Sequence, residues 1–155
     1  MTIPIVQGTI ENLDECVEAL LHSRLGYQYF PTQEQAAASL SEGFANKDIW
    51  VARLHEQPVG FYWWLPHGAF HAFPYLHILA VHHQRRGQGI GSQLLTDFER
   101  RAFAGASKVF LVVADFNPQA KKFYRQRGYT EVGIIPDLYR PGITEHLLMK
   151  VHDVS

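Results

Sequence analysis

A glycine-rich turn is the part of the sequence best suited to chemistry. Gly87, Gly89 and Gly91 alternate with Gln88 and Ile90, between an extended apolar run and a segment with helical spacing. Glycine lets the backbone turn sharply and present its N–H groups to a ligand, because no Cβ atom stands in the way. At a helix N-terminus these amides and the positive end of the helix dipole attract the same anion. The turn is therefore expected to hold a phosphate or a pyrophosphate.

The residues around the turn help to decide which kind of phosphate-binding motif it could be. His83, Arg85 and Arg86 precede the glycines and could add charge-assisted hydrogen bonds to a phosphate. The G-x-G-x-G spacing does not fit the G-x-G-x-x-G fingerprint of dinucleotide-binding folds, and the usual βαβ context is missing. No Gly-Lys-Ser/Thr ends the turn, which excludes a Walker A loop. The structural alternative is a flexible connection whose arginines face water.

The extended run before the turn carries two residues that could move protons. Within residues 75–81, strand alternation places Tyr75, His77, Leu79 and Val81 on one side. A histidine, with an ordinary pKa of about 6.5, is well matched to relaying a proton at neutral pH. The alternative for His77 is a hydrogen-bonded histidine on a half-buried strand.

Two motifs in register give the sequence its resemblance to a known family. Residues 86–91 read R-G-Q-G-I-G and fit the acyl-CoA loop pattern R/Q-x-x-G-x-G/A. Residues 117–129 fit the pattern N-x-x-A-x-x-F-Y-x-x-x-G-F/Y. The chain thus resembles the GNAT superfamily of acyl-CoA N-acyltransferases, most closely over residues 75–129. Residues 76–82 also look like the corresponding strand of arylalkylamine N-acetyltransferases, which use histidines there.

The resemblance implies a role for each motif residue. The backbone of Leu79 and Val81 would pair with the pantetheine arm of acetyl-CoA, while the amides of the glycine turn would hold the pyrophosphate. Asn117 would hydrogen-bond the pantetheine or order the strand end. Tyr124 would be the general acid that protonates the departing thiolate, its alternative being a tyrosine packed on the sheet. The implied cofactor-binding set is Leu79, Val81, Arg86, Gly87, Gln88, Gly89, Ile90, Gly91, Asn117 and Tyr124, and the catalytic set is Tyr124, His77 and Tyr75.

The sequence departs from some relatives in two places. Ribosomal-protein and other N-terminal acetyltransferases often have a glutamate on the strand before the asparagine motif, whereas residues 110–114 read F-L-V-V-A. No carboxylate base is available on that strand, so His77 or an ordered water is expected to accept the proton of the amine. His83 replaces the proline that is common after the acyl-CoA strand, which leaves the detailed shape of the loop open.

Aromatic residues crowd the segments that border the acceptor in this fold. They favour a small aromatic or apolar amine, or a peptide or protein N-terminus, as the acceptor. The alternative is that at least half of them fill the core. Residues 136–141 also resemble a loop that overhangs the acceptor in peptide-modifying relatives. The candidate acceptor contacts are Tyr29, Phe30, Trp64 and Tyr139.

Hydrophobic periodicity predicts the elements that would position these residues. Helical spacing is expected in residues 13–21, 33–46, 90–102 and 118–127, with an aromatic loop at residues 27–30. Strand patterns are expected in residues 3–6, 49–54, 59–65, 72–81, 108–114, 129–135 and 144–151, of which 49–81 would form an antiparallel meander. The fold class expected is α/β (α+β): a GNAT fold with a mixed, mostly antiparallel sheet of about seven strands and about four helices. Neither repeats nor linkers interrupt the chain, so one acetyltransferase domain should span residues 1–155.

Composition limits the partners and the compartment. The chain of 155 residues is 46% hydrophobic and 19% charged, which suits one soluble globular domain. A formal net charge of -1 supplies no basic field for nucleic acid or anionic lipid. Cys16 has no partner for an internal disulfide, and no apolar run suggests a signal peptide or a membrane span, so a cytoplasmic location is expected.

The histidines do not suggest a metal site. Although the chain has 9 histidines, no H-x-x-x-H pair stands on an expected helix. His82 and His83 are adjacent and would point opposite ways in an extended chain. No metal is therefore expected.

The leading hypothesis is an N-acetyltransferase that uses acetyl-CoA and a primary amine in a ternary complex. Its partners would be these two molecules, with no nucleic acid and no membrane, and a homodimer would be compatible. The alternative is a non-catalytic domain that binds acyl-CoA as a sensor.

Overall fold

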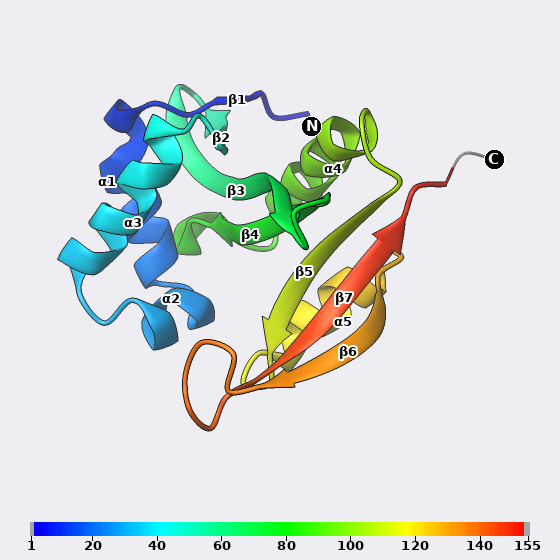
Figure 1. Cartoon of the computed structure of the whole chain (residues 1–155). Helices are drawn as coiled ribbons and strands as arrows, with labels where there is room; N and C mark the ends of the chain where they lie inside the picture. The colour runs from blue at the N-terminus through cyan, green and yellow to red at the C-terminus, as the bar shows by residue number, and fades with distance from the viewer. Residues whose placement is uncertain (1, 154–155) are drawn as a thin grey trace. The chain divides into compact units, whose positions relative to one another are not determined.

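The computed structural model describes residues 2–153, and these pack as two compact units (Figure 1). The first unit contains the chain up to Trp64 and the segment Ile78–Arg100. The second contains Leu65–His77 and the chain from Arg101 onward. The elements follow one another as β1 (Ile5–Gln7), η1 (Ile10–Asn12), α1 (Leu13–Leu21), α2 (Arg24–Tyr29), α3 (Gln33–Ala45), β2 (Ile49–Leu54), β3 (Gln57–Ala69), β4 (Phe73–Val81), η2 (His83–Arg85), α4 (Ile90–Phe103), β5 (Lys108–Ala114), α5 (Pro118–Arg125), β6 (Thr130–Pro136) and β7 (Thr144–Val151).

The seven strands form one mixed sheet in the order β1-β2-β3-β4-β5-β7-β6. β1 with β2, β2 with β3, β5 with β7 and β6 with β7 are antiparallel, whereas β4 and β5 run parallel. The expected class, a mixed and mostly antiparallel sheet of about seven strands, is therefore confirmed. The prediction of a single domain over residues 1–155 stays a prediction.

Helix α3 in the first unit shows how local sequence sets these elements. Thr32 caps α3, because its hydroxyl accepts a hydrogen bond from the amide of Gln35 at 3.1 Å. Four-residue spacing then buries Ala36, Leu40 and Phe44 on one face. A polar cap followed by an apolar stripe explains why the sequence pattern located this helix.

Helix α2 corrects one expectation and raises the number of α-helices to five among the described residues. Residues 27–30 were expected to form an aromatic loop. Instead α2 covers Arg24–Tyr29, and Ser23 caps it by accepting from the amide of Gly26 at 3.0 Å. Gly26 packs so closely on the carbonyl of Leu20 that a Cβ atom would overlap it. This close contact between the backbones of Gly26 and Leu20 cannot be predicted from hydrophobic periodicity.

The second unit is built around β5. Its Val109, Leu111 and Val113 are buried, as the nearly continuous apolar run predicts. β5 pairs with β4 at Tyr75↔Phe110 and with β7 along its whole length. A register shift between Glu131 and Gly133 interrupts the pairing of β6 with β7.

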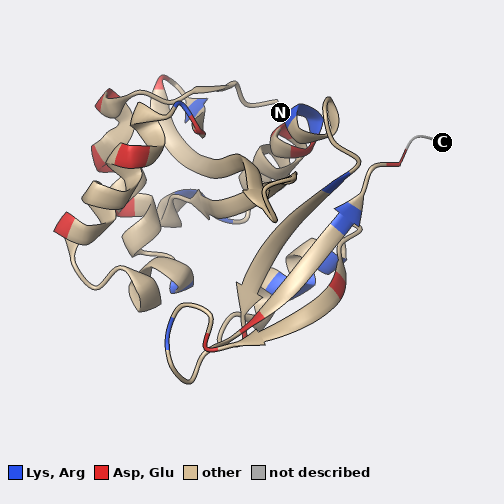
Figure 2. Ribbon diagram, in the orientation of Figure 1, with Lys and Arg blue, Asp and Glu red and all other residues tan. Residues whose placement is uncertain are grey.

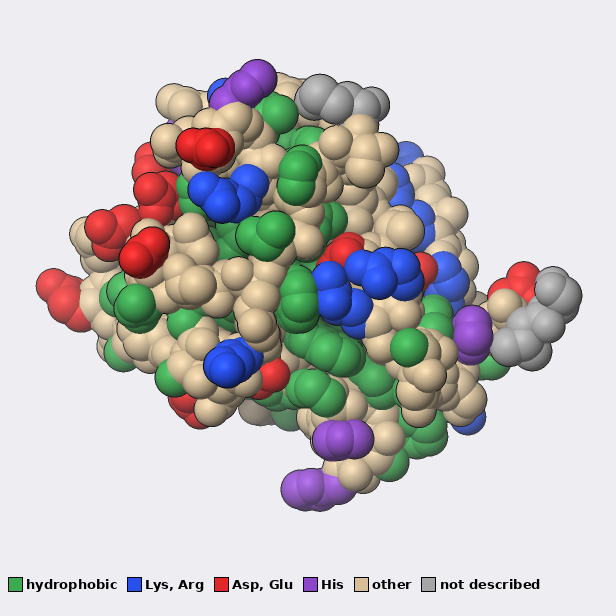
Figure 3. All heavy atoms as spheres, turned by 90° about the horizontal axis from the view of Figure 1, so that it is seen from above, with side chains coloured by type: hydrophobic (Ala, Val, Ile, Leu, Met, Phe, Trp, Pro, Cys, Tyr) green, Lys and Arg blue, Asp and Glu red, His purple; other side chains and the backbone are tan. Residues whose placement is uncertain are grey.

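Charge is distributed unevenly over the helices of each unit. Figure 2 shows acidic residues on α1 and α3 of the first unit and basic residues on α5 of the second. On the face drawn in Figure 3, red, blue and green side chains are interspersed. Within the described part of the chain, no helix combines the length and apolar character needed to cross a bilayer.

Candidate active site

Strand β4 presents the expected proton-transfer residues on its more accessible side. Tyr75, His77, Leu79 and Val81 are half-buried, whereas the residues that alternate with them are buried. The rings of Tyr75 and His77 lie 6.1 Å apart between centroids. Strand alternation therefore predicted the side of the strand correctly.

Tyr75 is joined to a residue that the sequence suggested only as an acceptor contact. The hydroxyls of Tyr75 and Tyr139 lie 3.0 Å apart and share a hydrogen bond. Burial, foremost, raises the pKa of the Tyr75 phenol, and the charge and hydrogen bond of Tyr139 add to the shift. The charges of Glu145 and Tyr124 raise this pKa further. Two proposed site residues thus meet within the second unit.

Tyr124 is buried on α5 between two aromatic rings. Phe123 lies 5.2 Å away and Tyr129 5.6 Å away between ring centroids, both edge to face. Burial raises the pKa of the Tyr124 phenol far above its ordinary value. The hydroxyl therefore keeps its proton at neutral pH, as a proton donor must.

His77 has the opposite tendency. Burial lowers the pKa of its imidazole, because a charged ring loses its hydration there. The ring is therefore neutral at neutral pH.

Asn117 has a structural role that differs from the two expected for it, a contact with the pantetheine or ordering of the strand end, and these two stay predictions. Its side chain accepts a hydrogen bond from the amide of Ala120 at 3.3 Å and so caps α5. Pro118 follows at the first helical turn, where its missing N–H costs nothing. The cap fixes where the helix begins and hence where Tyr124 stands on it.

Glu145 is a buried charged residue that the sequence analysis did not single out. Its side chain is only 2% exposed, and it stands on β7 opposite Ala114 of β5 and Ile135 of β6. The sequence held one signal for it: strand alternation places Glu145 on the same face as Leu147 and Met149. Burying a carboxylate is costly unless it is paired, and Glu145 takes part in an interaction within the chain.

The glycine turn belongs to the first unit and has the backbone that the sequence predicted. Gly87 and Gly89 have φ of +79° and +80°, a region that favours glycine. A Cβ atom built on either would meet no atom within 4 Å, so no side chain of the described chain fills those positions. Helix α4 starts directly at Ile90, which is buried and anchors the turn. This arrangement leaves room for an anion at a helix N-terminus.

The arginine before the turn is held by its own unit. A guanidinium nitrogen of Arg86 donates to the carbonyl oxygen of His22 at 2.8 Å. Guanidinium has five N–H donors, so this bond leaves others for a phosphate.

The expected aromatic contacts of the first unit lie mainly in packing positions. Trp64 stands edge to face with Phe98 of α4, with centroids 6.0 Å apart. Tyr29 and Phe30 are half-buried at the end of α2. Core packing thus explains part of the aromatic cluster.

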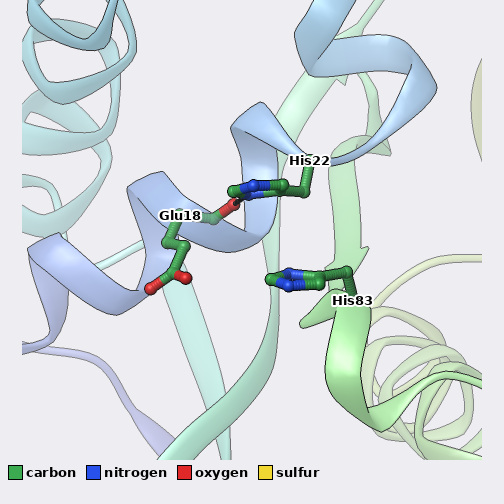
Figure 4. Close-up of side chains that lie close together, drawn as sticks. All are labelled: Glu18, His22 and His83. Atoms are coloured by element: carbon green, nitrogen blue, oxygen red, sulfur yellow. Dashed lines mark hydrogen bonds between the residues drawn. The ribbon is translucent and has the colours of Figure 1, made fainter.

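One group of possible metal ligands occurs among the described residues: Glu18, His22 and His83, all exposed (Figure 4). The rings of His22 and His83 stack with centroids 4.3 Å apart, and ligand atoms of all three residues lie within 4.8 Å of one another. Nδ1 of His22 lies 2.9 Å from the carbonyl oxygen of Glu18, to which it can donate. The expectation of no metal stays a prediction.

The sequence of the chain is similar to those of known acetyltransferases. The family described as "Acetyltransferase (GNAT) domain" matches residues 45–131. Blasticidin-S acetyltransferase of Streptomyces morookaense is 43% identical over 65 residues, which cover 42% of this chain and 47% of that protein. The chain spans less than half the length of the curated relatives it matches.

Solved structures show the same fold at low identity. Ard1 from Thermoplasma volcanium superposes with a TM-score of 0.81 and 18% identity, covering 97% of this chain and 98% of that one. The PaiA N-acetyltransferase from Thermoplasma acidophilum, solved in complex with coenzyme A, has a TM-score of 0.73 and 19% identity. It covers 98% of this chain and 100% of that one.

Proposed function

Because this chain belongs to the GNAT acetyltransferase family, we propose that it transfers the acetyl group of acetyl-CoA to a primary amine. The observation that carries this proposal is the turn at Gly87 and Gly89, with left-handed backbone and free space directly before α4. Such a turn suits the pyrophosphate of a CoA thioester. A GNAT neighbour solved with coenzyme A supports this ligand.

We assign most of the other contacts with acetyl-CoA to main-chain groups. The amides of Arg86 to Gly91 would hold the pyrophosphate, and the backbone of Leu79 and Val81 would pair with the pantetheine arm. Asn117 would fix the start of α5 in the second unit. These contacts use backbone groups whose number and spacing do not depend on the acceptor.

The reaction proceeds by direct attack in a ternary complex. An aliphatic ammonium, with a pKa of about 10, first loses a proton, which frees the electron pair of its nitrogen. Nitrogen then bonds to the thioester carbon and the carbon–sulfur bond breaks. Tyr124 protonates the departing thiolate and regains its proton from the nitrogen. His77, neutral because its pKa is lowered, or an ordered water takes the first proton.

A small amine is the acceptor that these observations favour. The relative named blasticidin-S acetyltransferase matches over 65 residues and supports a small-molecule acceptor over a protein N-terminus. Tyr139, 49% exposed, is the candidate acceptor contact of the second unit. Tyr29, Phe30 and Trp64 are the candidate acceptor contacts of the first unit.

We also place the reaction in the cytoplasm. Cys16 is a free, buried thiol, which suits a reducing compartment. Burial, foremost, raises the pKa of this thiol, so it is not a reactive thiolate.

The test is a CoA-release assay. The protein is mixed with acetyl-CoA, a thiol reagent and a panel of primary amines, including peptides with different first residues. We expect CoA release that depends on the amine. Tight acetyl-CoA binding without amine-dependent release would instead identify a non-catalytic sensor.

A further inference from the structure

We propose that Glu18, His22 and His83 form a binding site for a divalent transition-metal ion of the Zn²⁺ type. The ion joins the end of α1 to η2, the short helix that leads into the glycine turn. This site goes beyond the proposed acetyl transfer, which needs no metal, and it departs from the expectation of no metal that the sequence gave rise to.

Two local features bring the three residues together within the first unit. Glu18 and His22 are four residues apart at the end of α1, and side chains with this spacing are neighbours on a helix surface. His82 and His83 were expected to point opposite ways, but the chain turns into η2 after His82 and their rings stack with centroids 4.6 Å apart. His83 also stacks on His22, and both imidazoles extend toward Glu18 (Figure 4).

The three ligand groups suit zinc in kind and in spacing. Zinc commonly binds two imidazoles and a carboxylate, with water in the fourth position of a tetrahedron. Bonds of about 2.1 Å place the ligand atoms of such a site about 3.4 Å apart. Here the ligand atoms lie within 4.8 Å of one another, and all three residues are exposed. Small rotations of exposed side chains are therefore enough to close the site around an ion.

A hydrogen bond already prepares His22 for this role. Its Nδ1 lies 2.9 Å from the carbonyl oxygen of Glu18. A carbonyl oxygen can only accept, so Nδ1 carries the proton and Nε2 of the neutral ring keeps its lone pair. Metal-binding histidines usually donate their other ring N–H in this way, which fixes the tautomer and the orientation of the ring.

His82 supports the carboxylate from outside the ligand set. Its Nδ1 accepts a hydrogen bond from the amide of Gln84 at 3.3 Å, so in the neutral ring Nε2 carries the proton. This Nε2 lies 3.5 Å from Oε1 of Glu18. His82 thus has the place of an outer-shell partner that orients a ligating carboxylate.

The two pieces of chain that carry the ligands are connected before any ion binds. Arg86, directly after η2, donates to the carbonyl oxygen of His22 at 2.8 Å. This bond lowers the cost of ordering the site. The end of α1 also carries the negative pole of the helix dipole, and Asp14 and Glu15 add negative charge to the same helix. Both effects favour a cation.

Titration calorimetry of the whole chain with Zn²⁺ tests the site. We expect one ion per chain, and no binding of Mg²⁺, which prefers oxygen ligands and retains its water. His82→Ala should weaken Zn²⁺ binding about tenfold, the effect of losing an outer-shell partner. His22→Ala and His83→Ala remove a ligand and should weaken binding at least about a hundredfold.

His67→Ala is the matched control, because His67 is an exposed histidine of β3 in the second unit. It should leave Zn²⁺ affinity within about twofold. Amide hydrogen exchange gives a second readout, since an ion that joins α1 to η2 should slow exchange in η2. This slowing should appear in the wild type and in His67→Ala, and not in His22→Ala.

Several results would overturn the proposal. They are a wild type that does not bind Zn²⁺, binding that survives His22→Ala and His83→Ala, and binding that His67→Ala weakens as strongly. Zn²⁺ binding that leaves exchange in η2 unchanged would reject the junction with α1. If an alanine variant does not fold, Glu18→Gln takes its place, because it keeps the shape and removes the charge. Wild-type Zn²⁺ affinity in that variant would then reject the site. None of these readouts depends on acetyl transfer.

Discussion

Among single residues, Tyr124 allows the most specific prediction. Its phenol is buried with a raised pKa, which suits a group that must hold a proton until the thiolate departs. Tyr124→Phe removes only the hydroxyl. We expect turnover to fall about a hundredfold while acetyl-CoA affinity changes less than about threefold.

Tyr129 provides the control for this variant. It is buried beside Tyr124, with ring centroids 5.6 Å apart, so Tyr129→Phe reports the packing cost of a lost hydroxyl. Stopped-flow CoA release and calorimetric titration of acetyl-CoA measure the two quantities. Parallel losses of turnover and affinity in Tyr124→Phe would assign the residue to packing.

Residues whose role depends on a local pattern could be found in the sequence, and residues whose role depends on a partner strand could not. Tyr75 and His77 follow from alternation on β4, and the burial pattern of that strand confirms the side they occupy. Glu145 sits on a strand whose own pattern is ordinary. Its burial depends on its pairing with β5 and β6 on either side, and the sequence does not predict that pairing.

Among the elements, the turn before α4 makes the clearest prediction. Gly89→Ala puts a Cβ atom on a residue with φ of +80°, a strain of roughly 1–2 kcal/mol, although the atom itself meets no neighbour. We expect acetyl-CoA affinity to fall at least about tenfold, because both the amide geometry and the close approach of a phosphate suffer. Calorimetric titration measures the change.

A second open glycine controls for the added methyl group. A Cβ atom on Gly105 also meets nothing within 4 Å, and the backbone of Gly105 is not in the left-handed region. Gly105→Ala should therefore leave acetyl-CoA affinity unchanged. Unchanged affinity in Gly89→Ala as well would mean that the turn does not hold the phosphates.

The elements that the sequence revealed are those with a regular apolar period and a cap of their own. α3 has both, and β5 has the continuous apolar run of a strand covered on two faces. α2 has a cap at Ser23 but no regular apolar period over its 6 residues, and Gly26 packs against the carbonyl of Leu20. Short helices of this kind follow from tertiary contact, so their sequences read as loops.

Across the whole molecule, the proposed chemistry needs no metal, since each step moves a proton or an acyl group between side chains and substrates. Treatment with a chelator should therefore leave kcat/KM within about twofold of its starting value. The cluster of Glu18, His22 and His83 makes this a demanding test, because its ligand atoms lie within 4.8 Å of one another. A loss of activity that zinc restores in the wild type but not in His83→Ala would show that this cluster binds a required ion. His67, an exposed histidine of β3, provides the control. If zinc also fails to restore activity in His67→Ala, the zinc effect is not specific to the cluster.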